Sequence, residues 1–226
     1  TVAFAGIAAL LPSTLAKAPP ASVMDQVRVL GSARLLIVFA MTALGYGGTF
    51  VTFTFLAPVL QDITGFDASG VSLILILYGL AIAAGNIAGG RIADRDPVRA
   101  LTVLFALQAA VLVLFSFTMV SQTWALVTLA ALGFLQFANV PGLQLYVVQL
   151  ARLHRPGAVD VASALNIAAF NLGIAAGAWI GGLVVESPLG LPATPWVGAV
   201  LVAGALGLTV WSGALDRRPR QVLQAA

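Results

Sequence analysis

Apolar and polar positions follow one another in long alternating blocks along almost the whole of this 226-residue chain. The long apolar blocks each hold roughly the 20 residues that an α-helix needs to cross a hydrocarbon core about 30 Å thick. The pattern therefore predicts six membrane-spanning helices. These predicted spans cover residues 35–60, 69–90, 100–119, 123–150, 159–185 and 195–215.

The polar blocks divide the chain into four parts. We expect residues 1–15 to be the remnant of a preceding transmembrane helix, since no basic segment of the kind that opens a signal peptide comes before them. Residues 16–34 are expected to form a cytoplasmic linker, residues 35–215 a six-helix bundle, and residues 216–226 a cytoplasmic tail. The predicted fold class is all-α, a polytopic transmembrane helix bundle, and the chain is expected to be a fragment that lacks an amino-terminal half.

The composition points to lipid as the solvent of this chain. Hydrophobic residues make up 60% and charged residues 8% of the sequence, and the mean hydropathy is +1.02. A soluble fold of this size has no means of hiding so much apolar surface. Cysteine is absent, which excludes a disulfide framework or a thiolate metal site.

All eleven basic residues fall on one side of the membrane when the loops are assigned to alternate sides. The loops of the other side contain Asp62, Asp67 and Glu186 but no Lys or Arg. The positive-inside rule therefore predicts a cytoplasmic carboxy terminus. Ten arginines among the eleven basic residues hint at a GC-rich bacterial genome, and the expected location is the bacterial cytoplasmic (inner) membrane. Since the charges are scattered between apolar blocks, the net charge of +3 does not indicate nucleic-acid binding. The basic residues are Lys17, Arg28, Arg34, Arg91, Arg95, Arg99, Arg152, Arg155, Arg217, Arg218 and Arg220.

A glycine-rich helix end runs into a short charged loop between Gly85 and Arg99. This stretch resembles the G-x-x-x-D-R-x-G-R-R motif of the major facilitator superfamily, in the looser copy found between helices eight and nine. Pro97 and Val98 replace the glycine and one basic residue of that motif. The matching residues are Gly90, Asp94, Arg95 and Arg99.

The resemblance implies that this loop is a cytoplasmic gate. The Asp94 carboxylate is then expected near the positive amino end of a neighbouring helix, the one that begins near Val159, and paired with an arginine. In the alternative interpretation, the loop arginines only set the topology and Asp94 caps the next helix. The two interpretations are compatible.

A second informative stretch runs from Asn166 to Gly182 and contains glycines every four residues. These glycines form a flat stripe that lets another helix approach closely, with Asn166 on the same stripe and Asn171 on roughly the opposite face. The stretch resembles helix eleven of the drug, sugar and nucleoside efflux branch of the superfamily, and residues 52–66 support the same resemblance. The stripe consists of Gly173, Gly177 and Gly181.

Polar side chains inside the predicted spans are the candidates for a substrate cavity, because an unpaired polar group in lipid is costly. Helical spacing places Gln136, Asn139 and Tyr146 on one face, and Thr42, Tyr46 and Thr49 on another. Such residues also form interhelical hydrogen bonds worth about 0.6 kcal/mol each, so that role stays open. Pro58 and Pro141 are expected kink points, and Pro141 would interrupt the helix beside Asn139. The cavity candidates are Tyr46, Thr49, Gln136, Asn139, Tyr146, Asn166 and Asn171.

Charged groups are absent from the middle of the predicted spans, where proton relays use Asp, Glu or His. We therefore expect the proton carrier to lie in the missing half. The single histidine, His154, falls in a predicted loop and is interpreted as solvated. Motifs of zinc proteases, phosphate-binding loops and serine hydrolases are absent, so we expect no enzyme, no metal and no cofactor.

The leading hypothesis is a secondary active transporter that exports a drug, sugar or nucleoside by proton antiport, with this bundle rocking against the missing half. A proton-coupled importer of the same fold and a non-transporting membrane scaffold are the alternatives. The expected partners are the lipid bilayer, the missing amino-terminal half, a small-molecule substrate and protons, without nucleic acid.

Overall fold

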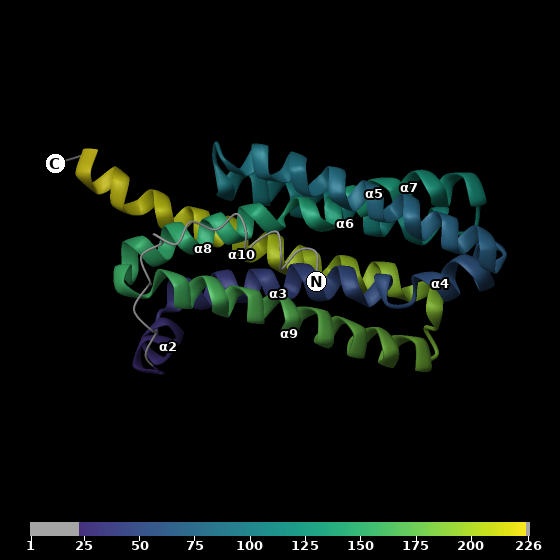
Figure 1. The fold of residues 1–226 in the computed structure, drawn as a ribbon, viewed down its shortest axis with the longest axis horizontal. Coiled ribbons are helices and arrows are strands. Elements are labelled where there is room, and N and C mark those ends of the chain that lie inside the picture. The colour runs from purple at the N-terminus through teal and green to yellow at the C-terminus, as the bar shows by residue number, and fades with distance from the viewer. Residues whose placement is uncertain (1–22, 225–226) are drawn as a thin grey trace, which may run out of the picture.

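Helices make up nearly all of the described chain, and the long ones run side by side along the molecule (Figure 1). This computed structural model describes the backbone of residues 23–224 and the side chains of residue 24 and residues 27–216. The predicted helix remnant at 1–15 lies outside the described residues. Within the described chain, six helical spans are long and apolar enough to cross a membrane, which confirms the predicted all-α bundle. They are α3 (Ala33–Phe53), α5 (Ala68–Ala93), α6 (Pro97–Thr118), α7 with α8 (Gln122–Ala138 and Val140–His154), α9 (Val159–Glu186) and α10 (Thr194–Gln224).

Helix also occurs in the segments that we expected to be a linker and a tail. α2 (Val23–Leu30) lies inside the expected linker and ends before Gly31, a residue that commonly stops helices. α10 continues from the bundle through most of the expected tail to Gln224. Four short elements complete the described chain: α4 (Leu56–Pro58), the π-helical turn η1 (Val59–Ile63), and the 3₁₀ turns η2 (Pro156–Ala158) and η3 (Leu191–Ala193).

The long helices pack in a network centred on α3. This helix contacts α9 and α10 along much of its length, and α10 also packs on α6. On the other side of the bundle α5 packs on α7 and α8. Figure 1 shows α3 running between α9 and α10. More than half of the α3 span is buried, whereas α5 and α9 are the least buried spans.

The glycine stripe of α9 packs against the backbone of α3. A Cβ at Gly173 would lie 2.5 Å from the carbonyl oxygen of Ala43, and no real side chain tolerates that distance. A Cβ at Gly177 would collide with the carbonyl oxygen of Gly47, and one at Gly181 would meet the next turn of α3. Side chains are excluded from this contact because the backbones touch, which is the kind of packing that the spacing of the stripe favours.

Both prolines singled out in the sequence lie beside irregular backbone. Pro58 precedes the π-helical turn η1, a kind of distortion that is common where an i→i−4 bond is lost. Pro141 has no N–H to donate to the carbonyl of Phe137, and that carbonyl instead accepts from the N–H of Asn139. The long fourth span is consequently divided at Asn139 into α7 and α8.

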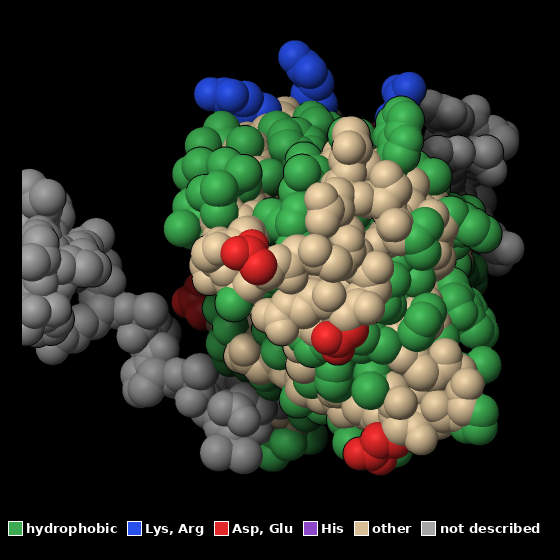
Figure 2. Space-filling model, turned by 90° about the vertical axis from the view of Figure 1, so that its right-hand side faces the viewer, with side chains coloured by type: hydrophobic (Ala, Val, Ile, Leu, Met, Phe, Trp, Pro, Cys, Tyr) green, Lys and Arg blue, Asp and Glu red, His purple; other side chains and the backbone are tan. Residues whose placement is uncertain are grey.

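The two ends of the bundle differ in charge. One end, here called the basic end, carries the arginines at the start of α3, the end of α5, the start of α6 and the end of α8. The other, the acidic end, carries exposed Asp62, Asp67 and Glu186, and the face in Figure 2 shows acidic side chains with blue only at its margin. Asp67 caps α5, and the Ser69 hydroxyl and the Gly70 N–H that donate to its carboxylate hold its pKa below the usual value. The described arginines of the basic end are Arg28, Arg34, Arg91, Arg95, Arg99, Arg152 and Arg155, while Lys17, Arg217, Arg218 and Arg220 lie outside the described side chains.

Candidate functional site

The interruption between α7 and α8 lies near the middle of the membrane span that these helices form together, Gln122–His154. Asn139 occupies the interruption, and its Nδ2 donates to Oε1 of Gln108 on α6 at 2.9 Å. Gln108 donates through Nε2 to the hydroxyl of Thr49 on α3. The Thr49 hydroxyl donates in turn to the carbonyl of Gly45, 3.1 Å away. This directed chain of hydrogen bonds links three spans through the interior of the bundle.

Three buried polar atoms near this chain have no hydrogen-bond partner in the described part of the molecule. They are the Tyr46 hydroxyl, Nε2 of Gln136 and Oδ1 of Asn139. The three residues, here called the midplane locus, are at most 3% exposed. The other amide atom of Gln136 is used, since its Oε1 accepts from the hydroxyl of Tyr78 on α5. Because a buried unpartnered polar group costs about 1–3 kcal/mol, three of them in one region need a reason.

Aromatic rings surround the midplane locus. The Tyr46 ring meets the Phe170 ring edge-on at 4.4 Å between centroids and the Phe137 ring at 5.6 Å. Phe50 lies 6.2 Å from Tyr46, and Phe53 continues the contact 5.3 Å further on. These four half-buried phenylalanines, Phe50, Phe53, Phe137 and Phe170, are here called the aromatic wall, and they come from α3, α7 and α9.

A second directed chain lies closer to the basic end. The hydroxyl of Thr42 donates to Oδ1 of Asn166 at 2.7 Å, and Nδ2 of Asn166 donates to Oε1 of Gln144 at 3.0 Å. Gln144 donates to the hydroxyl of Ser163. Asn166 is fully buried with both amide atoms paired, whereas Asn171 is exposed, so the two asparagines lie on different faces as their spacing indicates. Asn166 therefore ties α9 to α3 and α8.

A third group, here called the end cluster, joins α3, α8 and α10 at the basic end. Arg34 forms an ion pair with Asp216 and also donates to the carbonyl of Ser212 at 3.3 Å. The Tyr146 hydroxyl bonds Oδ2 of Asp216 and Oγ of Ser212, both at 2.7 Å. Sequence reasoning grouped Tyr146 with Gln136 and Asn139, but these bonds hold the Tyr146 hydroxyl in the end cluster. The ion pair had no sequence signal, because its partners are 182 residues apart.

The charged loop between α5 and α6 corrects one of our interpretations. Asp96, and not Asp94, caps α6: its Oδ1 accepts from the N–H of Arg99 at 3.0 Å, and Pro97 takes the first helical position. Asp94 ends α5, is exposed, and makes no ion pair with any described residue. α5 packs mainly on α7 and α8, and among the described residues no ion pair joins Asp94 to an arginine as we expected.

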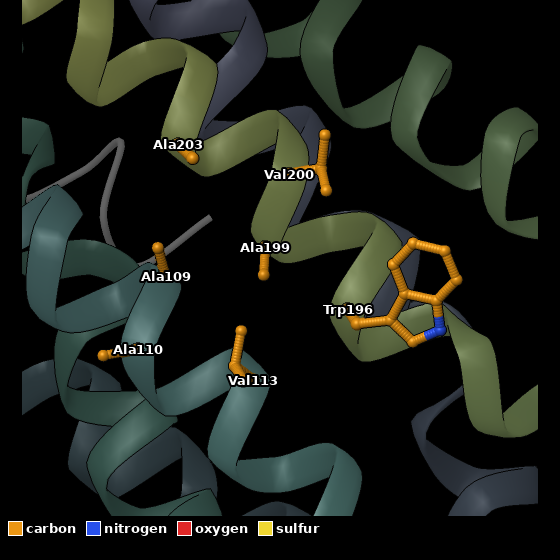
Figure 3. A pocket seen from close by; sticks show the side chains of 7 residues that line it. All are labelled: Ala109, Ala110, Val113, Trp196, Ala199, Val200 and Ala203. Carbon is orange, nitrogen blue, oxygen red and sulfur yellow. The ribbon is translucent and has the colours of Figure 1, made fainter.

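An apolar groove of about 520 Å³ lies between α6 and α10 on the outside of the bundle (Figure 3). Ala109, Ala110 and Val113 line it from α6, and Ala199, Val200 and Ala203 with Trp196 line it from α10. None of these side chains carries a charge, and Trp196 alone has a polar atom. The groove offers an apolar surface for lipid and lacks the hydrogen-bonding groups that the midplane locus has.

The six spans, the charged ends and the buried polar groups between them are those of a polytopic helical membrane protein. The family model for the Major Facilitator Superfamily matches residues 2–159 and 38–225, so the chain belongs to that superfamily. The superfamily comprises transporters and not enzymes.

Relatives agree with this assignment. YtbD of Bacillus subtilis, an uncharacterized MFS-type transporter, is 50% identical over 97% of this chain and 55% of its own length. The inner membrane transport protein YdhP of Escherichia coli K12 is 35% identical over 79% of this chain and 45% of its own length. A probable sugar efflux transporter of Helicobacter acinonychis is 31% identical over 78% of this chain and 44% of its own length. The chain spans about half the length of the curated relatives it matches.

Proposed function

We propose that the full-length protein is a secondary active transporter that exports a small molecule of the drug, sugar or nucleoside class, by proton antiport with alternating access, from a bacterial cytoplasm. The observation that carries this proposal is the midplane locus, where three buried polar atoms lack partners beside a broken helix. Transporter sites characteristically lie near the midplane beside interrupted helices. Purely structural polar groups, such as those of Asn166, have their partners within the bundle.

The direction of transport is proposed from similarity. A relative at 31% identity is named a probable sugar efflux transporter, and the stretch from Asn166 to Gly182 resembles the efflux branch. The described spans carry ionisable side chains only at or near their ends, so the proton carrier of the antiport belongs to a part of the protein beyond these residues.

The orientation and the partner surface follow from charge and exposure. We place the basic end in the cytoplasm according to the positive-inside rule, which makes the carboxy terminus cytoplasmic. The second half of a protein of the relatives' length would pack on the sides of α5 and α9, the least buried spans, where Asn171 is exposed. The motif residues Gly90, Asp94, Arg95 and Arg99 would then act as a gate across that interface, with a cation from the second half facing the exposed Asp94.

The test uses the full-length protein in everted membrane vesicles with an interior-acid gradient followed by a pH-sensitive dye. Adding sugars, nucleosides and drugs one at a time is expected to dissipate the gradient for the true substrate, because export in this geometry moves protons out of the vesicle lumen. Vesicles without the protein are the control. If no compound changes the gradient while intact cells accumulate one of them in a proton-dependent way, the protein is an importer and the proposed direction is wrong.

A further inference from the structure

The chain contains three tyrosines, and each hydroxyl has a different environment. The Tyr146 hydroxyl is paired within the end cluster, and the Tyr78 hydroxyl donates to Gln136. The Tyr46 hydroxyl has no partner among the described residues, although Tyr46 is only 3% exposed. A buried tyrosine normally has a hydrogen-bond partner for its hydroxyl. Tyr46 therefore differs from Tyr78 and Tyr146, and its hydroxyl is free to bond a group outside the described residues.

A circuit of contacts brings the unpartnered atoms of the midplane locus into one neighbourhood. Thr49, one turn from Tyr46 on α3, accepts from Gln108, which accepts from Asn139. Gln136 lies one turn before Asn139, and it bonds Tyr78. The Tyr78 ring stacks on the Phe53 ring at 5.6 Å, and the aromatic wall leads from Phe53 through Phe50 to Tyr46. Since each step is a direct contact or one helical turn, the residues of the midplane locus and the aromatic wall belong to one contiguous region of the bundle.

The unpartnered atoms have complementary chemistry. Nε2 of Gln136 is a donor, Oδ1 of Asn139 is an acceptor, and the Tyr46 hydroxyl can act as either. The Asp, Glu, Arg and His side chains of the described spans lie at or near the helix ends, away from the midplane locus. Because a charged ligand here would be buried without a counter-charge from the described residues, the locus favours an uncharged ligand.

We propose that the midplane locus and the aromatic wall bind an uncharged, ring-bearing small molecule with at least one hydrogen-bond acceptor and one donor. Gln136 donates to the acceptor, Asn139 accepts from a hydroxyl or N–H group, and the ring of the ligand lies against the half-buried phenylalanines. The Tyr46 hydroxyl makes the third polar contact. This inference rests on the proposed transport function and narrows its substrates to neutral compounds with a ring.

The first arm of the test compares stabilities of the full-length protein in nanodiscs without substrate. Tyr46→Phe removes only the unpartnered hydroxyl and keeps the ring contacts, so the melting temperature is expected to equal or exceed that of the unmodified protein. Tyr78→Phe is the matched control, and it is expected to lower the melting temperature because it breaks the bond to Gln136. An equal loss in both variants would overturn the inference, since the Tyr46 hydroxyl would then be paired by an ordered water or by the rest of the protein.

The second arm measures binding by titration calorimetry with matched neutral and charged probes. Inosine and chloramphenicol are the neutral ring compounds, and inosine 5′-monophosphate is the charged counterpart of inosine. At least one neutral probe is expected to bind. Inosine monophosphate is expected to bind at least tenfold more weakly than inosine. Tyr46→Phe is expected to weaken the affinity for the neutral probe about tenfold, which corresponds to the loss of one buried hydrogen bond. Tyr146→Phe, at the far end cluster, is expected to leave binding unchanged. If neither neutral probe binds, or if Tyr46→Phe binds it as tightly as the unmodified protein, the assignment of this locus is overturned.

The two arms separate this inference from the proposed function. Vesicle transport of a charged compound that is insensitive to Tyr46→Phe would leave the transporter function in place and overturn the ligand assignment. Binding of inosine or chloramphenicol that depends on Tyr46, in a protein that dissipates no gradient with any compound, would support the ligand assignment and contradict proton antiport.

Discussion

At the basic end, the side chains of the end cluster satisfy one another, whereas halfway along the bundle the midplane locus leaves one polar atom unpartnered on each of its three residues. Both regions draw polar side chains from α3 and the α7–α8 span, but the end cluster adds Ser212 and Asp216 of α10 and contains an ion pair. The carboxylate of Asp216 accepts from Arg34 and from Tyr146, and the same tyrosine also bonds Ser212.

The difference separates polar side chains that stabilise contacts between helices from polar side chains that are left to bind something outside the described bundle. In the end cluster each polar side chain fastens one helix to another, and removing it should loosen α3, α8 and α10. In the midplane locus the unpartnered atoms contribute nothing favourable to the ligand-free bundle, and removing one should cost little or even help. Stability changes on substitution therefore report which role a residue has.

The largest expected effect is at the ion pair of the end cluster. Asp216→Ala leaves Arg34, 17% exposed in its side chain, without its carboxylate, and deprives Tyr146 of one partner. Because the Asp216 side chain is 37% exposed, the loss should fall below that of a fully buried pair, at about 2 kcal/mol in the free energy of unfolding. Unfolding of the full-length protein by SDS in mixed micelles measures it.

A double-mutant cycle supplies the control for the ion pair. The cycle compares Arg34→Ala, Asp216→Ala and the double variant. The double variant should lose clearly less free energy of unfolding than the sum of the two single losses, with a coupling energy of about 1 kcal/mol. Additive losses would mean that the contact is screened by solvent and that the end cluster does not fasten the helices.

A smaller loss is expected at Tyr146. Tyr146→Phe keeps the buried ring and removes the hydroxyl that bonds Asp216 and Ser212, at a cost of about 1 kcal/mol in the same measurement. Ser212→Ala is the matched control, since it removes only one of the two partners and should cost less. If the Tyr146→Phe variant is as stable as the unmodified protein but transports poorly, Tyr146 lines the substrate cavity, as its position in the sequence indicated, and does not fasten the helices.

The sequence predicted those features that depend on local spacing. Six apolar blocks predicted the six spans, and glycines at every fourth position predicted the close contact of α9 with another helix. The opposite faces of Asn166 and Asn171 follow from the 3.6-residue period alone. The cap of α6 could also have been predicted from the sequence, because proline is common at the first helical position and Pro97 therefore marks Asp96 as the cap.

Features that depend on which helices become neighbours could not be predicted in this way. Arg34 and Asp216 meet only because α3 packs beside α10, and nothing near either residue signals the other. Face analysis grouped Tyr146 with Gln136 and Asn139, but it gave no sign of Ser212 and Asp216 on α10, the partners that hold the Tyr146 hydroxyl at the basic end. Spacing likewise identified polar side chains inside the spans but gave no means of separating paired from unpartnered amide atoms.

The smallest expected effect, and the sharpest contrast with the end cluster, is at Asn139. Asn139→Leu loses the hydrogen bond to Gln108 but also removes the buried, unpartnered Oδ1, so the two contributions nearly cancel and the stability should change by less than about 0.5 kcal/mol. Gln108→Leu is the matched control with the same new side chain. It breaks the bonds to both Thr49 and Asn139 and removes no unpartnered atom, so it should cost about 2 kcal/mol. If Asn139→Leu is as destabilising as Gln108→Leu in the absence of substrate, then Oδ1 of Asn139 has a permanent partner in the full-length protein, and the contrast between the midplane locus and the end cluster disappears at that residue.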